Sequence, residues 1–538
     1  MPQTFERPRH ASLLGKQPAA SWLDILAVTL LGLFFAPVFL NSLLFLLGFP
    51  IWFYSLDISV VLVFLGAIIL SRAPVCAVFA LCLGVLCVWA SGWFFDASWD
   101  GIAYHQTAVV ELARGLNPAY SVFTNWSSDL NNNFPKASWI FGATLYSRLG
   151  DIQFGKAYTL IVLLATLAYS LHAFRRQSPT VRALGFLACL NPVILCQVFT
   201  YYVDGAMASL TTILVFYAWR TFREEERLSN AEHTLAAMST ILICGLKFTG
   251  VVYTVIVVGI LALCLLLRRA MPEFKALVRR VAVPTLIGVC IVGFNPYITH
   301  LLSGRHIFHP IAGKDRIGVM TYNSPAGFLE KDRLSKLAIS IFSRSAHVNA
   351  SRTAQLKPPF VVYPGEWEAF ESYDLRIGGF GALFSGILLC SLALALWRPR
   401  DISPWTLVLL TALTLVNPEA WWARYAPFIW LIPFFLAMGA RVPGWARGGL
   451  MLLVLLNLFM LTRVSVSHQL RWTNALRKAL EPNAHKTCWV YYTQYFDFQP
   501  TAERYDITLI PEPHGYTPDG ETKCLEMVLD ARLCCPKK

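Results

Sequence analysis

The sequence contains few charged residues. Aspartate, glutamate, lysine and arginine make up 14% of its 538 residues, whereas about a quarter is usual in soluble domains. There is also no Walker A loop, no HExxH or CxxC metal signature, no internal repeat and no low-complexity tract. The low charge argues against a separate soluble catalytic domain of ordinary size. The missing motifs give no sign of a P-loop or of a metal site of these types.

Hydrophobic residues are abundant instead, at 56% of the chain, and they fall in long blocks. The blocks are roughly 15–25 residues long, the length that crosses a bilayer core as a helix. This pattern predicts an all-α polytopic membrane protein with about 13 transmembrane helices. The predicted spans are 22–47, 55–71, 74–94, 157–174, 183–200, 206–219, 235–249, 251–267, 281–299, 379–397, 403–417, 427–440 and 449–463.

The basic residues predict which way these spans run. If the N-terminus is cytoplasmic, most arginines and lysines near the spans fall on the cytoplasmic side, and the short turns on the other side hold only Lys247 and Arg424. This asymmetry follows the positive-inside rule. It predicts an inner-membrane protein with a cytoplasmic N-terminus and a periplasmic C-terminus. It also explains much of the formal net charge of +13, so no nucleic-acid partner is expected.

Three of the predicted outside segments are long. The loops at 95–156 and 300–378 belong to a transmembrane domain predicted over 22–463, which follows a cytoplasmic segment at 1–21. The segment 464–538 alternates hydrophobic and polar residues, which predicts a small extracytoplasmic α/β appendage. An oxidising exterior would permit disulfides there. The sequence leaves open how four cysteines of this appendage would pair: Cys488, Cys524, Cys534 and Cys535.

Ionisable side chains gather at the outer ends of different spans. Such groups are costly next to a membrane and by default mark function. A helical bundle could bring them to one outward-facing cavity that contains both carboxylates and cations. The residues are Asp96, Asp100, Asp204, Lys247, Arg305, His306, His309, Glu419 and Arg424.

Asp100 also has a structural interpretation. The stretch GIAYHQTAVVELARGL, residues 101–116, is predicted to be helical, and aspartate is a favoured N-cap. An apolar stripe that includes Ile102 and Val109 predicts that this helix lies at the membrane interface. We expect Asp100 both to cap this helix and to present a carboxylate.

The other residues have structural alternatives as well. Asp204 could be a solvated turn residue, and Lys247 or Arg424 could extend to lipid headgroups. Histidines 300, 306 and 309 could bind a metal, although their spacing matches no strong pattern.

The mixture of charges suits one kind of chemistry. A carboxylate can act as a general base towards an acceptor hydroxyl or amine. Arginine binds phosphate through its bidentate fork, and lysine binds it as a point charge. A donor whose leaving group is a lipid phosphate would reach such cations laterally from the outer leaflet. The set therefore favours glycosyl transfer from a polyprenyl-phosphate sugar.

Five stretches resemble the GT-C superfamily of integral membrane glycosyltransferases, and the similarity in pattern and order covers roughly residues 20–440. They are SWDGIAYHQ, YYVDGAMAS, GLKFTG, SGRHIFHPI and NPEAWWARYAPFIWLIP. The acidic motif that such enzymes keep in their first large outer loop is matched by Asp96 and Asp100. The resemblance implies that Asp100 is the catalytic base, with Asp96 as second choice, and that Arg424 and Lys247 contact the lipid phosphate.

The resemblance also implies the remaining substrate contacts and the partners. The expected donor is a polyprenyl-phosphate sugar, and the acceptor is a lipid-linked glycan, a lipid or a protein outside the membrane. No cofactor is assigned; some members use a divalent metal, and that point stays open. The expected substrate-binding residues are Tyr104, His105, Asp204, Lys247, Arg305, His306, His309, Glu419, Arg424 and Tyr425.

Other function classes remain as alternatives. A lipid-linked oligosaccharide flippase or other transporter would place polar residues along a path through the membrane, whereas here they follow the outer ends of the spans. An O-antigen ligase or polymerase would place its key arginines and histidine in a late loop, whereas here the acidic cluster comes early.

Overall fold

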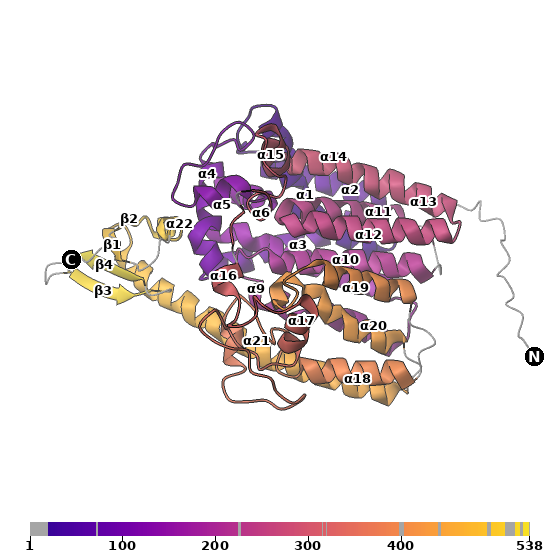
Figure 1. Ribbon diagram of the computed structural model, residues 1–538. Coiled ribbons are helices and arrows are strands. Elements are labelled where there is room, and N and C mark those ends of the chain that lie inside the picture. The colour runs from indigo at the N-terminus through magenta and orange to yellow at the C-terminus, as the bar shows by residue number, and fades with distance from the viewer. Residues whose placement is uncertain are drawn as a thin grey trace, which may run out of the picture.

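The fold is a bundle of long helices with loops gathered at one end (Figure 1). The computed structural model describes residues 20–71, 74–223, 227–314, 316–318, 320–397, 403–439, 443–491, 497–511, 522–527 and 531–536. The predicted segment 1–21 lies almost wholly outside the described residues.

The helices of the bundle follow the hydrophobic blocks of the sequence. They are α1 (Trp22–Leu46), α2 (Ser55–Ser71), α3 (Pro74–Trp93), α7 (Tyr158–Ala173), α8 (Pro179–Ala188), α9 (Pro192–Gln197), α10 (Asp204–Arg223), α11 (Asn230–Leu246), α12 (Phe248–Leu267), α13 (Met271–Leu277), η3 (Val278–Ala282), α14 (Val283–Val292), α18 (Phe384–Trp397), α19 (Pro404–Val416), η7 (Pro427–Trp430), α20 (Leu431–Gly439) and α21 (Gly444–Leu480).

Shorter elements form the loops and the C-terminal part. They are η1 (Gly101–His105), α4 (Gln106–Ala113), α5 (Ser128–Asn133), α6 (Ala137–Leu149), η2 (Ile152–Ala157), η4 (Phe294–Ile298), α15 (Thr299–Leu302), α16 (Met320–Asn323), α17 (Arg333–Ile341), η5 (Glu368–Glu371), η6 (Ala423–Tyr425), η8 (Glu481–Asn483), β1 (Thr487–Tyr491), α22 (Gln499–Ala502), η9 (Glu503–Tyr505), β2 (Thr508–Pro511), β3 (Thr522–Glu526) and β4 (Arg532–Pro536).

The structure supports a membrane protein. Among the described helices, fewer are long and apolar enough to span a membrane than the sequence predicts. Within the described residues, five helices are long and apolar enough to cross a membrane, or six if the bent pair 271–292 and 294–302 counts as one span. A helix overlaps each of the 13 predicted spans, but several of these helices are short. The number 13 therefore stays a prediction.

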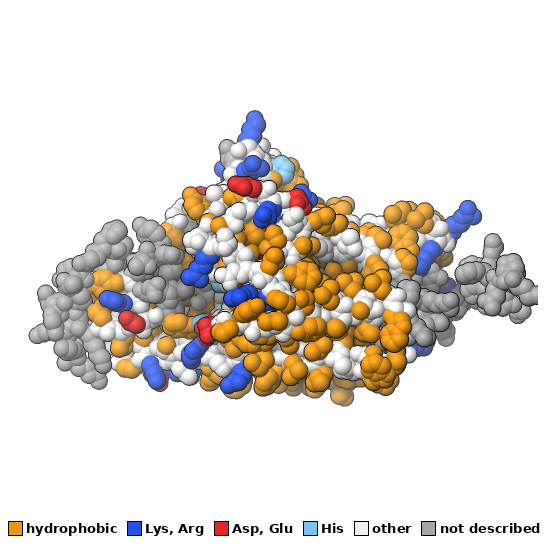
Figure 2. Space-filling view, turned by 60° about the horizontal axis from the view of Figure 1, so that its bottom comes forward, with side chains coloured by type: hydrophobic (Ala, Val, Ile, Leu, Met, Phe, Trp, Pro, Cys, Tyr) orange, Lys and Arg blue, Asp and Glu red, His pale blue; other side chains and the backbone are white. Residues whose placement is uncertain are grey.

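The surface of the bundle exposes many apolar side chains, as expected of a protein that lies in a bilayer. Hydrophobic side chains cover its side, and charged side chains lie mainly outside that band (Figure 2). Exposed apolar residues include Val75 on α3, Leu267 on α12, Leu286 on α14 and Leu452 on α21. In a membrane these side chains would face lipid, which satisfies them without protein contacts.

Local sequence signals set the two ends of α11. α11 begins with a capping box, in which Ser229 accepts from the Glu232 amide and the Glu232 carboxylate accepts from the Ser229 amide. α11 ends at Leu246 and α12 begins at Phe248. Lys247 between them has an extended backbone, so its side chain leaves the bundle axis at this break.

The predicted helix at 101–116 differs from the observed structure. It is divided into the π-helix η1 and the α-helix α4, and it ends at Ala113. Asp100 stands at the N-cap position of η1, but its side chain makes no capping hydrogen bond, so the predicted capping role is wrong. Ile102 and Val109 are buried in the protein core, and α4 packs against α6. The apolar stripe is thus covered by protein and does not face a membrane interface.

The C-terminal part is a helix followed by a four-stranded sheet. α21 runs through the predicted domain boundary at 463/464 and extends beyond the bundle towards the sheet (Figure 1). The strand order is β2-β1-β4-β3, with β1 parallel to β2 and antiparallel to β4. Two disulfides supply the pairing that the sequence left open, Cys488–Cys535 and Cys524–Cys534.

Gln469 of α21 joins two of the outer loops. Its amide Nε2 donates to the carbonyl of Phe95 over 2.6 Å, and its Oε1 accepts from the hydroxyl of Tyr373, also over 2.6 Å. One turn further along, Thr473 accepts from the Phe95 amide. The long helix therefore fixes the start of the first outer loop and the end of the second.

Candidate active site

Five ionisable side chains from separate parts of the chain meet at the outer end of the bundle. Asp100 precedes η1, Asp204 is the first residue of α10, and Lys247 lies between α11 and α12. Arg424 belongs to η6, after α19, and Asp374 lies in the loop between η5 and α18. We call this group the Arg424 cluster.

Arg424 is the centre of the cluster because its guanidinium contacts three carboxylates. Nη1 lies 3.2 Å from Asp100 Oδ2 and 3.6 Å from Asp204 Oδ2, and Nε lies 3.1 Å from Asp374 Oδ1. Lys247 Nζ is 2.5 Å from the other oxygen of Asp204. The Arg424 side chain keeps 10% of its surface exposed and that of Asp100 keeps 15%, so the cluster is partly accessible.

Aromatic rings surround the two cations. The Arg424 guanidinium carbon lies 4.9 Å from the ring centroid of Tyr202, 5.1 Å from that of Trp422 and 5.2 Å from that of Tyr425. Lys247 Nζ lies 4.2 Å from the Tyr425 centroid. Such cation–π contacts help to hold the two charges in place. They also leave the guanidinium edge free to pair with acidic groups.

The second outer loop supplies further support. Asp374 Oδ2 pairs with Arg376 Nε at 2.8 Å, and Asp374 Oδ1 accepts from the indole Nε1 of Trp422 at 2.7 Å. Arg376 also donates to the side-chain oxygen of Asn323 at 2.8 Å. Asp374 is thereby fixed in the position from which it holds Arg424.

The pKa values separate the carboxylates by role. Burial raises the pKa of Asp100, although Arg424 opposes the change. Burial also acts to raise the pKa of Asp374, but Arg424 and Arg376 outweigh it, and the net shift is downward. The pKa of Arg424 lies well above its ordinary value: burial opposes the charge, but Asp374 and the other acidic neighbours more than compensate. Asp100 is therefore the more basic of the two carboxylates, and Asp374 stays ionised.

Asp96, the second-choice base, lies apart from Arg424 and shapes the loop. It is fully buried, and its carboxylate accepts from the Ser98 amide at 2.9 Å and the Tyr201 amide at 3.0 Å. A side chain on Gly101 would meet Asp96 Oδ2 at 2.0 Å, so only glycine fits there. Asp96 thus holds a tight turn that ends just before η1.

Tyr104 and His105 are buried beneath the cluster. His105 Nδ1 accepts from the indole Nε1 of Trp139. Burial, followed by Arg424 and Lys247, lowers the pKa of His105 to about 3, so the ring is neutral at pH 7. Burial and Asp100 raise the pKa of Tyr104 well above its usual range. Both residues are neutral polar groups next to the cluster.

The predicted residues at 300–309 form a different group. Asn133 Oδ1 lies 3.0 Å from His300 Nε2 and 3.5 Å from Arg305 Nη1, and the rings of His300 and His309 pack edge to face. Arg305 and His306 are exposed. The contacts of these residues lead to α5 and not to Arg424.

Glu419 also contacts other partners. Its Oε2 accepts from the indole Nε1 of Trp421 at 2.5 Å and lies 3.5 Å from Lys336 Nζ. Glu419 therefore connects the segment between α19 and η6 to Lys336 of α17.

Sequence reasoning missed Asp374, Arg376 and Tyr202. Tyr202 stands in YYVDGA, two residues before the predicted Asp204. Asp374 and Arg376 occur in ESYDLRIGGF, inside a long loop without periodicity. The only available signal was an acidic and a basic residue two apart next to glycines.

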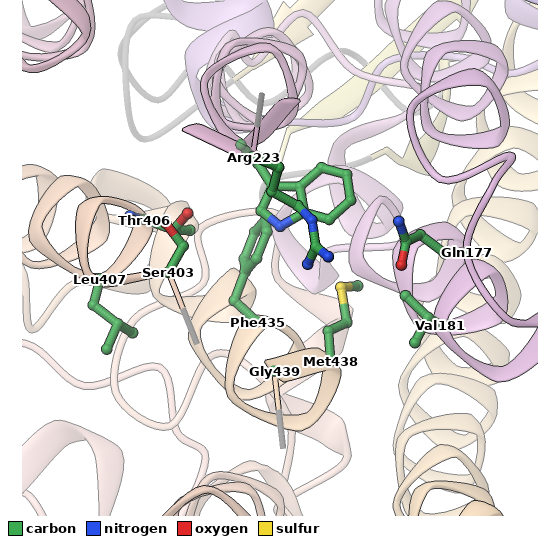
Figure 3. A pocket seen from close by; sticks show the side chains of 10 residues that line it. Gln177, Val181, Arg223, Ser403, Thr406, Leu407, Phe435, Met438 and Gly439 are labelled. Atoms are coloured by element: carbon green, nitrogen blue, oxygen red, sulfur yellow. Dashed lines mark hydrogen bonds between the residues drawn. The ribbon is translucent and has the colours of Figure 1, made fainter. Parts of the chain in front are cut away.

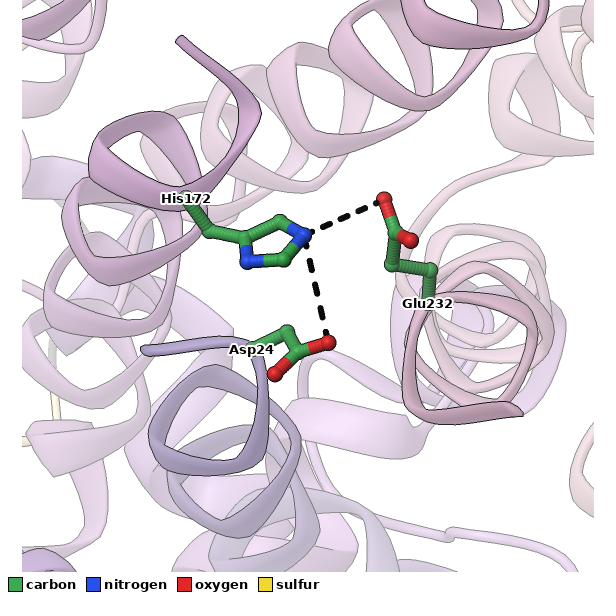
Figure 4. Close-up of side chains that lie close together, drawn as sticks. All are labelled: Asp24, His172 and Glu232. Carbon is green, nitrogen blue, oxygen red and sulfur yellow. Dashed lines mark ion pairs between the residues drawn. The ribbon is translucent and has the colours of Figure 1, made fainter. Parts of the chain in front are cut away.

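A second buried ionic group was also missed, and we call it the His172 cluster. His172 Nε2 lies 3.5 Å from Glu232 Oε1 and 3.9 Å from Asp24 Oδ2 (Figure 4). Arg220 Nε lies 2.7 Å from Glu232 Oε1, and Ser229 donates to Asp24 Oδ2 at 2.8 Å. Among the described residues this is the one set of three side chains arranged as metal ligands could be. The arginine beside it makes it a set of ion pairs already satisfied by protein.

The two described cavities lie away from the Arg424 cluster. One is bordered by Gln177 and Val181 on one side and by Phe435 and Met438 on another, where the ends of α8, α10, α19 and α20 meet (Figure 3). The other borders Lys136. Each encloses about 20 Å³, room for little more than a water molecule, so neither holds a sugar or a lipid.

Comparisons with known proteins give one likeness in fold. No family model matches the chain, and no curated protein matches it by sequence. Among solved structures, a similar chain is ArnT from Cupriavidus metallidurans, crystallised with undecaprenyl phosphate. It is 11% identical, the match covers 85% of this chain and 97% of that one, and the TM-score is 0.49. No conclusion about function rests on a likeness of this size.

Proposed function

We propose that the protein is a membrane glycosyltransferase. It transfers a sugar from a polyprenyl-phosphate donor to an envelope glycan, lipid or protein acceptor on the outer face of the membrane. One observation carries this proposal: the basic carboxylate Asp100 lies 3.2 Å from Arg424, and Lys247 enters the same partly exposed cluster through Asp204. A general base and two phosphate-binding cations are the groups that this transfer needs.

The reaction follows from the distribution of charge. The acceptor oxygen or nitrogen attacks the anomeric carbon, and its proton goes to Asp100. The bond between that carbon and the phosphate oxygen breaks, and the electron pair leaves with the polyprenyl phosphate. Arg424 and Lys247 stabilise the departing phosphate from a largely buried cluster, where such stabilisation is stronger than in bulk water. A direct displacement of this kind inverts the anomeric carbon.

The ion pair between Arg424 and Asp100 gives the site an order of events. In the free protein, Arg424 stabilises the charged form of Asp100. When a donor phosphate engages the guanidinium, it competes with Asp100 for the same positive charge. Asp100 then becomes a stronger base at the moment the donor is bound, which discourages proton uptake before the donor arrives.

A divalent metal does not fit this donor set as it stands. Each of the three carboxylates already has an oxygen within 3.6 Å of Arg424, and a cation would have to displace that arginine. The proposed steps therefore use only side chains of the chain itself. Metal dependence can be tested directly by comparing donor cleavage with and without EDTA.

The proposal is tested with protein in lipid nanodiscs. Undecaprenyl phosphate, which ArnT binds, is the first probe, and binding is measured by native mass spectrometry. Undecaprenyl-phosphate-linked sugars are then supplied, and release of free sugar to water gives a readout that needs no acceptor. Arg424→Gln should weaken binding and abolish release, while the matched variant Arg305→Gln should behave as the wild type. Equal binding and release by Arg424→Gln would falsify the assignment.

The orientation of the proposed enzyme needs a separate experiment. We propose a cytoplasmic N-terminus, as the basic residues indicate, and 13 spans, an odd number that puts the C-terminal sheet on the outside with the Arg424 cluster. A reporter fused after Lys538 that works only outside the cytoplasm should be active. Activity of a reporter that works only in the cytoplasm would contradict both the span number and the side of the reaction.

A further inference from the structure

The C-terminal segment 497–511 contacts the loop that carries Asp100. The Asp497 amide donates to the carbonyl of Ile102 at 3.3 Å, and the Thr107 hydroxyl donates to Asp497 Oδ2 at 3.2 Å. The ring of Tyr505 stacks on Phe95, with 6.5 Å between centroids. The segment therefore reaches both ends of the short stretch between α3 and α4.

Thr501 is the most buried polar link in this contact. Its side chain is 3% exposed; the hydroxyl donates to Gln106 Oε1 at 3.1 Å and accepts from Gln153 Nε2 at 3.2 Å. Gln153 Oε1 accepts in turn from the Asp96 amide at 2.8 Å and from Lys156 Nζ at 2.6 Å. One hydroxyl thus uses both of its hydrogen-bonding roles to connect α4 with η2.

This link leads to the Arg424 cluster by a short route. The Asp96 carboxylate, whose backbone Gln153 holds, accepts from the Tyr201 amide at 3.0 Å. The next residue, Tyr202, lies against Arg424. On the other side, Asp96 closes the turn that places Asp100. Thr501 is therefore connected to Asp100 and to Arg424 only indirectly, through Gln153 and Asp96, and it contacts neither of them.

Surface contacts add to the attachment. Glu503 pairs with Arg114 at 2.9 Å and accepts from the hydroxyl of Tyr146. Arg504 donates to the carbonyl of Gly92 at 2.8 Å and lies 3.3 Å from Asp151. Exposed ion pairs of this kind contribute little to stability. The buried hydroxyl of Thr501 is the contact whose loss would leave unpaired polar groups.

We propose that Thr501 is a positioning residue, through which the C-terminal appendage holds the Asp100 loop in its working geometry. This inference rests on the proposed function for its effect on transfer, but the contact can be tested without it. Thr501→Val keeps the shape of the side chain and removes the hydroxyl, which leaves Oε1 of Gln106 and Nε2 of Gln153 without that partner. Thr501→Ser keeps the hydroxyl. Thr508→Val is the matched control, because Thr508 lies on β2 in the same segment and is exposed.

The first measurement is hydrogen–deuterium exchange of the peptide 95–106 in nanodiscs. Thr501→Val should speed exchange there by about tenfold, which is the effect of losing a buried hydrogen-bonding partner. Thr501→Ser and Thr508→Val should exchange as the wild type does. If Thr501→Val matches the wild type, or if Thr501→Ser is as fast as Thr501→Val, the positioning role is refuted. Should Thr501→Val not fold, Thr501→Ala also removes the hydroxyl, with faster exchange expected over 95–106 and wild-type exchange refuting the role.

The second measurement is release of sugar from an undecaprenyl-phosphate-linked donor. Thr501→Val should lower kcat about tenfold with KM unchanged, because Asp100 is displaced while the phosphate-binding cations remain. Thr501→Ser should restore kcat. A rise in KM with kcat unchanged would contradict the positioning role. If the wild type cleaves no donor, the proposed function fails, and the exchange measurement still decides whether Thr501 holds the loop.

Discussion

The Arg424 cluster and the His172 cluster have similar compositions and different settings. Both combine carboxylates with arginine in a buried position. In the His172 cluster, Asp24 is fully buried and Glu232 is 1% exposed, and both interact with serines at helix ends. In the Arg424 cluster, Asp100 is 15% and Lys247 is 27% exposed, and Lys247 lies at the break between α11 and α12. The two clusters thus share buried charge, and they differ in how accessible their side chains are.

The strongest test of this difference is Asp100→Asn. A general base contributes typically about 10²- to 10⁴-fold to a rate, so sugar release should fall by that factor while undecaprenyl phosphate still binds. The thermal unfolding temperature should change little, because Arg424 keeps two other carboxylate partners, Asp204 and Asp374. Asp129→Asn, an exposed residue of the same loop, is the matched control. Wild-type release by Asp100→Asn would leave the two clusters without a functional distinction.

The corresponding change in the His172 cluster is Glu232→Gln. It removes one charge from a buried set and breaks the ion pair between Glu232 and Arg220, and breaking a buried pair costs about 3–5 kcal/mol of folding free energy. The fraction of protein that stays folded on heating should fall, and sugar release per folded molecule should stay within about twofold of wild type. Glu273→Gln, on α13, is the control. A selective loss of release in a protein of wild-type stability would show that this cluster also takes part in the reaction.

A smaller effect is expected from Asp374→Asn, and it appears mainly in the pH profile. Asp374 raises the pKa of Asp100 through its negative charge. Removing that charge lowers the pKa of Asp100, so the base form persists to lower pH. The acid limb of the kcat profile should therefore move to lower pH, with kcat reduced about tenfold because Arg424 loses one partner. An acid limb that moves to higher pH would contradict the assignment of Asp100 as the base.

The smallest effect is expected at the group formed by Asn133, His300 and Arg305. Arg305→Gln should change donor binding and sugar release by less than about twofold, as for a surface substitution away from the chemistry. A large rise in KM for the donor would extend the site from the Arg424 cluster to α15. That result would restore the substrate-binding role that the sequence suggests for Arg305.

The sequence predicts those parts of the site that follow from helix direction. Asp100, Asp204, Lys247 and Arg424 each stand at the same end of a hydrophobic block, so a bundle must place them at one face. The structure brings these four together in the Arg424 cluster. Their roles in catalysis stay predictions. The same reasoning grouped Arg305 and Glu419 with them, because position at an end does not say which neighbour a side chain contacts.

The remainder depends on contacts between segments far apart in the chain. Asp374 lies in an aperiodic loop, and only the fold brings it to Arg424, 50 residues further on. The observed role of Asp96 depends on the Tyr201 amide, which no local pattern indicates. The His172 cluster was missed because its acidic residues stand at helix starts, where such residues are common caps.

The length of α21 connects the site to the membrane. At about 1.5 Å per residue, its 37 residues span about 56 Å, whereas the hydrocarbon core of a bilayer is about 30 Å thick. A helix that enters a thicker or thinner bilayer adjusts by tilting. Because Gln469 of α21 holds both Phe95 and Tyr373, a change of tilt would act on the Asp100 loop and on the Asp374 loop at the same time. We therefore expect the rate of sugar release from the lipid-linked donor to depend on the acyl-chain length of the surrounding lipid.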